Sequence, residues 1–379
     1  MRIVFLFIAE PHQIFHALPI AAEMAAAGSD VDVAVASPDH LRMVEQVARA
    51  YPGFAPNVAL LGQRGVARWL RDWGLFRNPR LPILFGALSF LRQFDAIVAP
   101  ERTTTAIRHF LSRRTRLIFT PHGAGDRAIT FDPRDRHFDF VLVAGEKSEQ
   151  RMLDAGTIRP GCYAVNGYVK LDLMPRLQKM REPLFANGRP TILYAPHFRR
   201  SLSSWDRFGR DLIAWFAAQD RYNLVVAPHI RLFAEASEAE RDAVMRLAIP
   251  GKILIDLHSD RLFDMSYTSG ADIYIGDVSS QVYEFLATPR PCVFLNAHRV
   301  EWEGNPDYLF WTLGDVVDDL SELPGALDRA PARHPLYADA QRERLAESIG
   351  GDPAGAARRG AEAISRFLAK DAPQDMSGG

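Results

Sequence analysis

The stretch DIYIGDVSSQVYEFLATPRPCVFLN, residues 272–296, decides the fold class. It begins with a short apolar run, passes through the loop Gly-Asp-Val-Ser-Ser into a helical segment, and ends in a second apolar run, residues 291–295. Short apolar runs that alternate with helical segments are typical of βαβ units, whose parallel strands are buried on both faces. This stretch therefore predicts a parallel sheet covered by helices.

The same alternation extends through most of the chain. Apolar runs such as RIVFLFI, VDVAVA and RLIFT lie in the N-terminal half, and TILYA and NLVVA in the C-terminal half. The pattern lapses at residues 174–189, which end in turn signals. We therefore expect an α/β protein of two Rossmann-like domains that face each other across a cleft. The expected parts are residues 1–175, 188–335, C-terminal helices over 336–370 and a flexible tail over 371–379.

Composition limits the classes of function. The chain has 379 residues, 47% of them hydrophobic, and a net charge of −1. Such a balance gives no overall field that attracts nucleic acid, so we expect no nucleic-acid partner. Two cysteines in different expected domains, Cys162 and Cys292, are typical of a reducing cytoplasm. No apolar run approaches the roughly 20 residues of a membrane span, and a cytoplasmic location is expected.

The loop before the helical segment of residues 280–286 is the strongest candidate for binding a phosphate. Ser279 or Ser280 stands at the start of that segment, where free backbone N–H groups and the helix dipole favour an anion. Asp277 belongs to the same loop, and Glu284 lies about one turn further on, where a carboxylate could accept from ribose hydroxyls. A serine that only caps the helix is the alternative.

The segment RLIFTPHGAGDRA, residues 116–128, places a histidine after another expected strand. His122 would lie at the carboxyl end of that strand, where an imidazole can take a proton from an acceptor hydroxyl. Gly123 would let a donor approach the backbone closely. A histidine that only holds its own loop is the alternative.

The triplet Ala-Pro-His follows two strands of the C-terminal half. His197 is followed by Arg199 in one loop, and His229 by Arg231 in the other. Cationic groups at this edge would neutralise a diphosphate, although solvated arginines in two surface loops are the alternative. The histidines of this half do not have the spacing of metal ligands, so no metal site is expected.

A basic, aromatic stretch covers residues 64–94. Such a stretch can lie in a membrane interface and attract anionic lipid. Two ordinary helices that pack their aromatic side chains inward are the slightly favoured alternative. A peripheral contact with the inner face of the cell membrane through residues 64–94 is thus the membrane partner that we consider.

Together these motifs resemble the CDP-glycerol glycerophosphotransferases, the teichoic-acid polymerase and primase family of GT-B fold. The segments that carry the resemblance are ILYAPHFR, APHIR, the PHG loop, DIYIGDVSSQVYEFLATPRPCVFL and NGYVKLD, and they span roughly residues 116–313. Pro121, His197 and Val278 depart from the family's usual residues, so the donor head group, whether glycerol, ribitol or another, stays open.

The resemblance implies transfer of glycerol phosphate from CDP-glycerol to a hydroxyl, with release of CMP, in cell-envelope polymer synthesis. His122 would be the base, His229 would stabilise the phosphate, and Ser279 and Ser280 would contact the donor phosphates and Glu284 the ribose. The CDP-linked donor is then a substrate and no resident cofactor is expected, while the acceptor is a saccharide or a lipid-linked molecule. Residues 1–175 would be the acceptor-side domain and residues 188–335 the nucleotide-donor domain. Three alternatives remain: a glycosyltransferase of the same fold that uses a nucleotide sugar, an enzyme like the UDP-N-acetylglucosamine 2-epimerases, and a non-catalytic nucleotide-binding protein.

Overall fold

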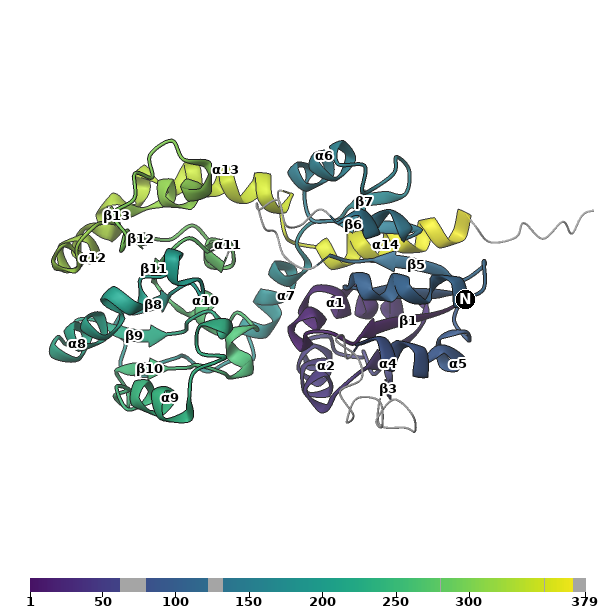
Figure 1. Cartoon of the computed structure of the whole chain (residues 1–379), viewed down its shortest axis with the longest axis horizontal. Coiled ribbons are helices and arrows are strands. Elements are labelled where there is room, and N and C mark those ends of the chain that lie inside the picture. The colour runs from purple at the N-terminus through teal and green to yellow at the C-terminus, as the bar shows by residue number, and fades with distance from the viewer. Residues whose placement is uncertain (62–79, 122–131, 280, 351, 371–379) are drawn as a thin grey trace, which may run out of the picture. The chain divides into compact units, whose positions relative to one another are not determined.

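The computed structural model describes residues 1–61, 80–121, 132–279, 281–350 and 352–370 (Figure 1). The chain forms two compact units, one of Met1–Leu177 with the chain from Ala346 onward, and one of Gln178–Leu345. Each unit is an α/β domain built on a parallel sheet, which confirms the predicted fold class. The tail over 371–379 and most of the stretch over 64–94 lie outside the described residues.

The first unit contains a parallel sheet of seven described strands in the order β3-β2-β1-β4-β5-β6-β7. The apolar runs of the sequence form its central strands, which are buried on both faces. The strands are β1 (Arg2–Phe7), β2 (Asp30–Val35), β3 (Asn57–Leu60), β4 (Ala96–Ala99), β5 (Arg116–Phe119), β6 (Phe140–Val143) and β7 (Tyr163–Val165).

Helices of the first unit flank this sheet (Figure 1). They are α1 (Ile14–Ala26), α2 (Pro38–Ala50), α4 (Arg80–Gly86), α5 (Leu88–Leu91), α6 (Glu146–Asp154), α7 (Val169–Gln178) and α14 (Ala356–Lys370). Shorter 3-10 turns include η1 (Pro11–Gln13), η2 (Arg102–Phe110) and η4 (Pro133–His137). Helix α2 begins where the side chain of Ser37 accepts from the backbone N–H of His40, as an N-cap serine does.

Helix α14 returns the C-terminal part of the chain to the first unit, where it contacts α1. The Asp172 carboxylate in α7 accepts from the backbone N–H groups of Gly355 and Ala357 at 2.8 and 2.9 Å and so satisfies amides at the start of α14. The loop before α6 and the loop before α14 approach each other closely at Gly145 and Gly350. A Cβ on Gly145 would lie 2.7 Å from the Gly350 nitrogen, so this approach requires glycine. The sequence pattern alone does not assign residues 336–370 to either half.

The second unit contains a parallel sheet of six described strands in the order β10-β9-β8-β11-β12-β13. They are β8 (Thr191–Ala195), β9 (Asn223–Val226), β10 (Ile253–Ile255), β11 (Ile273–Gly276), β12 (Cys292–Leu295) and β13 (Asp315–Val317). The helices are α8 (Arg210–Ala218), α9 (Glu238–Met245), α10 (Ser266–Gly270), α11 (Gln281–Phe285) and α12 (Leu323–Arg333), and α13 (Ala338–Ile349) leads back to the first unit.

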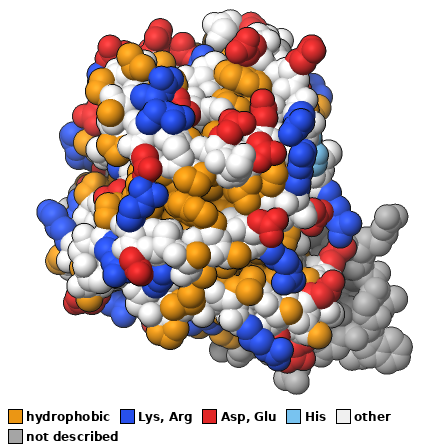
Figure 2. Space-filling view, turned by 90° about the vertical axis from the view of Figure 1, so that its left-hand side faces the viewer, with side chains coloured by type: hydrophobic (Ala, Val, Ile, Leu, Met, Phe, Trp, Pro, Cys, Tyr) orange, Lys and Arg blue, Asp and Glu red, His pale blue; other side chains and the backbone are white. Residues whose placement is uncertain are grey.

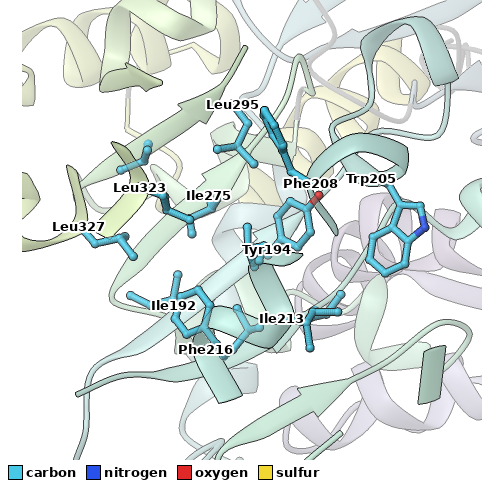
Figure 3. Close-up of a cluster of buried hydrophobic side chains, with 14 of the residues drawn as sticks. Ile192, Tyr194, Trp205, Phe208, Ile213, Phe216, Ile275, Leu295, Leu323 and Leu327 are labelled. Atoms are coloured by element: carbon cyan, nitrogen blue, oxygen red, sulfur yellow. The ribbon is translucent and has the colours of Figure 1, made fainter. Parts of the chain in front are cut away.

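A core of large apolar side chains holds the second unit together (Figure 3). Tyr194 and Ile275 from the sheet, Phe216 from α8 and Leu327 from α12 are fully buried in it. Burial of such a side chain contributes about 1.5–3 kcal/mol to the stability of the fold. This core therefore stabilises the strands from whose ends the loops begin.

The surface of the face that carries α8, α9 and α12 mixes both signs of charge (Figure 2). Arg221 and Asp328, for instance, form an ion pair there at 2.6 Å. None of the described helices has the length and apolar character required to cross a membrane.

Candidate functional site at the strand ends of the second unit

The order of strands reverses once in each sheet, between β1 and β4 in the first unit and between β8 and β11 in the second. Ligands of open parallel sheets bind beyond the carboxyl ends of the strands at such a reversal. In the second unit, the loops that leave β8, β9 and β11 contain most of the residues predicted for the donor site.

Asp277 joins the two strands at this reversal. It is fully buried directly after β11, and its Oδ2 accepts from the backbone N–H groups of His197 and Ser204 at 2.8 and 3.0 Å. The hydroxyl of Tyr194 lies 2.8 Å from that of Ser204 and extends this network. Asp277 therefore fixes the loop after β8, a role additional to the donor contact predicted for it.

The environment of Asp277 alters its acidity. Burial raises the pKa of Asp277 to about 6, although hydrogen bonds from Ser204 and from the backbone of His197 act in the opposite direction. Its second oxygen, Oδ1, has no hydrogen-bond partner in the described part of the chain. The carboxyl group therefore changes its protonation close to neutral pH.

The two Ala-Pro-His loops come together as their positions predict. The rings of His197 and His229 lie 6.1 Å apart between centroids. The Nδ1 of His197 accepts from the backbone N–H of Arg199 at 3.0 Å, and the Nδ1 of His229 accepts from that of Arg231 at 3.2 Å. Because Nδ1 acts as an acceptor, the neutral form of each ring carries its proton on Nε2.

His229 stays neutral at physiological pH. Burial, reinforced by the positive charge of Arg231, lowers the pKa of His229 to about 4. A neutral ring with a protonated Nε2 is a hydrogen-bond donor and a poor proton acceptor. This state suits a group that binds a phosphate oxygen, the role predicted for His229, and not that of a general base.

Phe198, which is not among the residues predicted for the site, lies at the centre of this cluster. Its ring centroid is 4.6 Å from that of His197 and 4.6 Å from that of His229. The exposed guanidinium groups of Arg199 and Arg231 lie 5.7 and 5.6 Å from the same centroid. One aromatic ring thus gathers two imidazoles and two cations, and its place between two predicted site residues was the signal that could have revealed it.

The loop after β11 leads into a short helix. Ser279 is buried, and its hydroxyl accepts from the backbone N–H of Gln281 at 3.3 Å. Helix α11 has only five residues, so it offers a small dipole, and Glu284 is half-buried within it. Ser279 thus makes the contact of a local cap, and its contact with the donor phosphates stays a prediction.

Three predicted residues, His122, Gly123 and Ser280, lie outside the described residues. Their roles remain predictions. No group of three or more His, Cys, Asp or Glu side chains suited to a metal ion occurs within the described ranges.

No known family model and no curated protein sequence matches this chain. Solved structures do match it. A wall teichoic acid polymerase, TagF, has a TM-score of 0.65 and 13% identity, over 97% of this chain and 89% of that one. A UDP-GlcNAc 2-epimerase from Neisseria meningitidis, bound to UDP-GlcNAc, has a TM-score of 0.62 and 12% identity, over 98% of this chain and all of that one. The S. aureus MnaA–UDP structure has a TM-score of 0.63 and 12% identity, over 97% of each chain.

The chain has a GT-B fold. Identities of 12 and 13% support this fold and not a particular family within it. In this GT-B protein the histidine and arginine cluster follows β8 and β9 of the second unit.

Proposed function

We propose that this chain is a transferase that moves a polyol phosphate, of the glycerol phosphate kind, from a CDP-linked donor to a hydroxyl group. The acceptor is a saccharide or a lipid-linked molecule of the cell envelope, and the reaction takes place at the cytoplasmic side, with residues 64–94 as a peripheral membrane contact. The observation that carries the proposal is the cluster of His197, His229, Arg199 and Arg231 around Phe198.

This cluster has the chemistry that a diphosphate requires. Two guanidinium groups supply positive charge and forked donors, and the neutral imidazole of His229 supplies an Nε2–H donor next to the ring of His197. Because burial keeps His229 neutral, its ring donates throughout the reaction while charge moves to the leaving group. Donors that are already in place when charge develops are the largest single contribution to many enzymatic rates.

In the proposed step, the acceptor oxygen attacks the phosphorus that carries the polyol, and the hydroxyl proton passes to His122. The bond from this phosphorus to the bridging oxygen breaks, and CMP leaves with the bond's electrons. His229, together with Arg199 and Arg231, would meet the charge that develops on CMP. Positioning and electrostatics supply most of the rate in phosphoryl transfer of this type.

Two solved structures support the choice of donor class without separating its members. One solved TagF structure is of a variant soaked with CDPG, and the Neisseria enzyme is bound to UDP-GlcNAc. The second candidate is therefore an enzyme of nucleotide sugars, either a 2-epimerase or a glycosyltransferase. The nearly equal TM-scores, 0.64 and 0.62, favour this alternative almost as well.

A product assay separates these candidates. The full chain is incubated with CDP-glycerol, CDP-ribitol, UDP-N-acetylglucosamine and other nucleotide sugars, each with and without a hydroxyl acceptor. We expect CMP release from a CDP-polyol that increases when the acceptor is added. Turnover of UDP-N-acetylglucosamine without any acceptor, and no CMP release from CDP-polyols, would replace the transferase by the epimerase.

A further inference from the structure

Each unit joins its two central strands through a carboxyl group at the carboxyl edge of the sheet. In the first unit, Glu101 follows β4, and its Oε1 accepts at 3.0 Å from the backbone N–H of Ile8, which follows β1. This contact corresponds to that of Asp277 with His197 in the second unit. Glu101 therefore lies at the reversal of strand order in its own sheet.

A second pair of carboxylates joins the same strands at the opposite edges. Asp95 accepts from the backbone N–H of Arg2 at 2.8 Å, and Asp272 accepts from that of Thr191 at 2.7 Å. Both of these residues are exposed, so an exposed carboxylate is sufficient to hold a strand pair of this kind. Glu101 and Asp277, in contrast, make their contacts from buried positions at the carboxyl edge.

Glu101 carries a cost that the fold alone does not explain. It is 4% exposed, and its Oε2 has no hydrogen-bond partner within the described residues. The hydroxyl of Thr104, three residues further along η2, is also buried without a partner there. A buried polar group without a partner destabilises the fold, and such groups concentrate at functional sites.

The turn that Glu101 holds carries polar side chains at the carboxyl edge of the first unit. Ile8 is followed closely by Glu10 and His12, which are exposed and half-exposed. Glu10 forms an ion pair with Arg80 at 3.2 Å. In the second unit, the turn held in the same way begins with His197 of the proposed donor site. The turn Ile8–His12 is therefore the counterpart, in the first unit, of the loop that begins with His197.

We propose that Glu101 is a positioning residue for the acceptor, which acts by holding the turn Ile8–His12 through its contact with the Ile8 N–H. This inference rests on the proposed transfer, since it assigns the hydroxyl-bearing acceptor to the first unit. The acceptor group is the polyol or saccharide hydroxyl of the proposed transfer.

The test compares Glu101→Ala, Glu101→Gln and Asp95→Ala in the full chain. Asp95→Ala removes a matched contact between the same two strands at the opposite edge. CMP release is measured with CDP-glycerol as donor and glycerol as the acceptor probe. We expect Glu101→Ala to lower kcat/KM for glycerol at least tenfold, with KM for CDP-glycerol changed less than twofold. Glu101→Gln keeps an oxygen for the Ile8 N–H and is expected to restore most of the rate, and Asp95→Ala to match the wild type.

Three results would overturn the inference: an equal loss in Asp95→Ala, an equal effect of Glu101→Ala on donor and acceptor, or no effect of Glu101→Ala. If the wild type converts UDP-N-acetylglucosamine and not CDP-glycerol, the proposed transfer fails. If the wild type releases CMP from CDP-glycerol but Glu101→Ala has no effect on the acceptor, only the inference about Glu101 fails.

Discussion

In the first unit Glu101 joins β4 to the residue after β1, and in the second unit Asp277 joins β11 to the residue after β8. The two contacts are alike, but their surroundings differ. Around Asp277 lie imidazoles and guanidinium groups, whereas the turn held by Glu101 carries Glu10, paired with Arg80, and His12. The difference teaches that one backbone contact can hold loops of different charge, with histidines and arginines in one unit and an acidic residue paired with an arginine in the other.

The largest expected effect concerns the proposed donor site of the second unit. His229→Ala removes an Nε2–H donor from the proposed phosphate site, and we expect kcat for CMP release to fall about 100- to 1000-fold. His258→Ala, which changes an exposed histidine after the neighbouring strand β10, serves as the control and is expected to leave kcat unchanged. Equal rates in both variants would remove His229 from the mechanism.

A second prediction compares the two carboxyl groups as structural contacts. Asp277→Ala leaves two buried N–H groups without a partner, and Glu101→Ala leaves one. At pH 5, we expect the free energy of unfolding to fall by about 2–4 kcal/mol in Asp277→Ala and by about 1–2 kcal/mol in Glu101→Ala. Urea unfolding followed by circular dichroism measures both, and the reverse order would contradict the contacts described.

A third prediction concerns pH and stability. Burial raises the pKa of Glu101 from 4.5 to about 7 and that of Asp277 from 3.8 to about 6. A raised pKa in the folded state means that the folded state binds more protons, so stability is lost as pH rises through these ranges. The free energy of unfolding of Glu101→Gln, compared with that of the wild type, is therefore expected to increase as pH rises from 4.5 to 7. The increase is expected to be on the order of 2–3 kcal/mol.

For Asp277→Asn the corresponding increase in relative stability is expected to end near pH 6, about one pH unit lower than for Glu101→Gln. Melting temperatures recorded from pH 4 to pH 8 follow both changes. Stability differences that do not vary with pH would show that these carboxyl groups titrate normally.

The smallest expected effect concerns the exposed arginines of the donor site. Arg199→Ala and Arg231→Ala are each expected to weaken CDP binding about three- to tenfold, and the loss is expected to shrink in high salt because both side chains are exposed. Calorimetry with CDP at two salt concentrations measures the change. Arg246→Ala, at an exposed position after α9, provides the control, and a comparable loss there would reduce the effect to overall charge.

Much of the fold follows from local patterns in the sequence. Buried parallel strands are continuous apolar runs, and RIVFLF and IYIG illustrate how directly such runs become β1 and β11. The return of α14 to the first unit could not be predicted, because it depends on contacts of Asp172 with amides more than 180 residues away. Local patterns carry no information on such distant pairings.

Only the part of the candidate site that depends on local patterns could be predicted. The repeated Ala-Pro-His triplets predicted His197 and His229 at the carboxyl ends of two strands, and these strands are neighbours, so the two rings lie close together. Glu101 was missed because its partner, Ile8, lies 93 residues earlier. A signal existed, since an acidic residue follows both β4 and β11 within two positions. His122 and residues 64–79 remain predictions from the sequence.

The most direct test of the donor site is hydrogen–deuterium exchange of the full chain with and without CDP. The account predicts that CDP slows exchange in residues 197–204 and 229–232, which form the loops after β8 and β9, and leaves residues 8–12 of the first unit unchanged. Protection confined to other segments, or none in these two loops at saturating CDP, would contradict the proposal that the histidine and arginine cluster binds the nucleotide diphosphate.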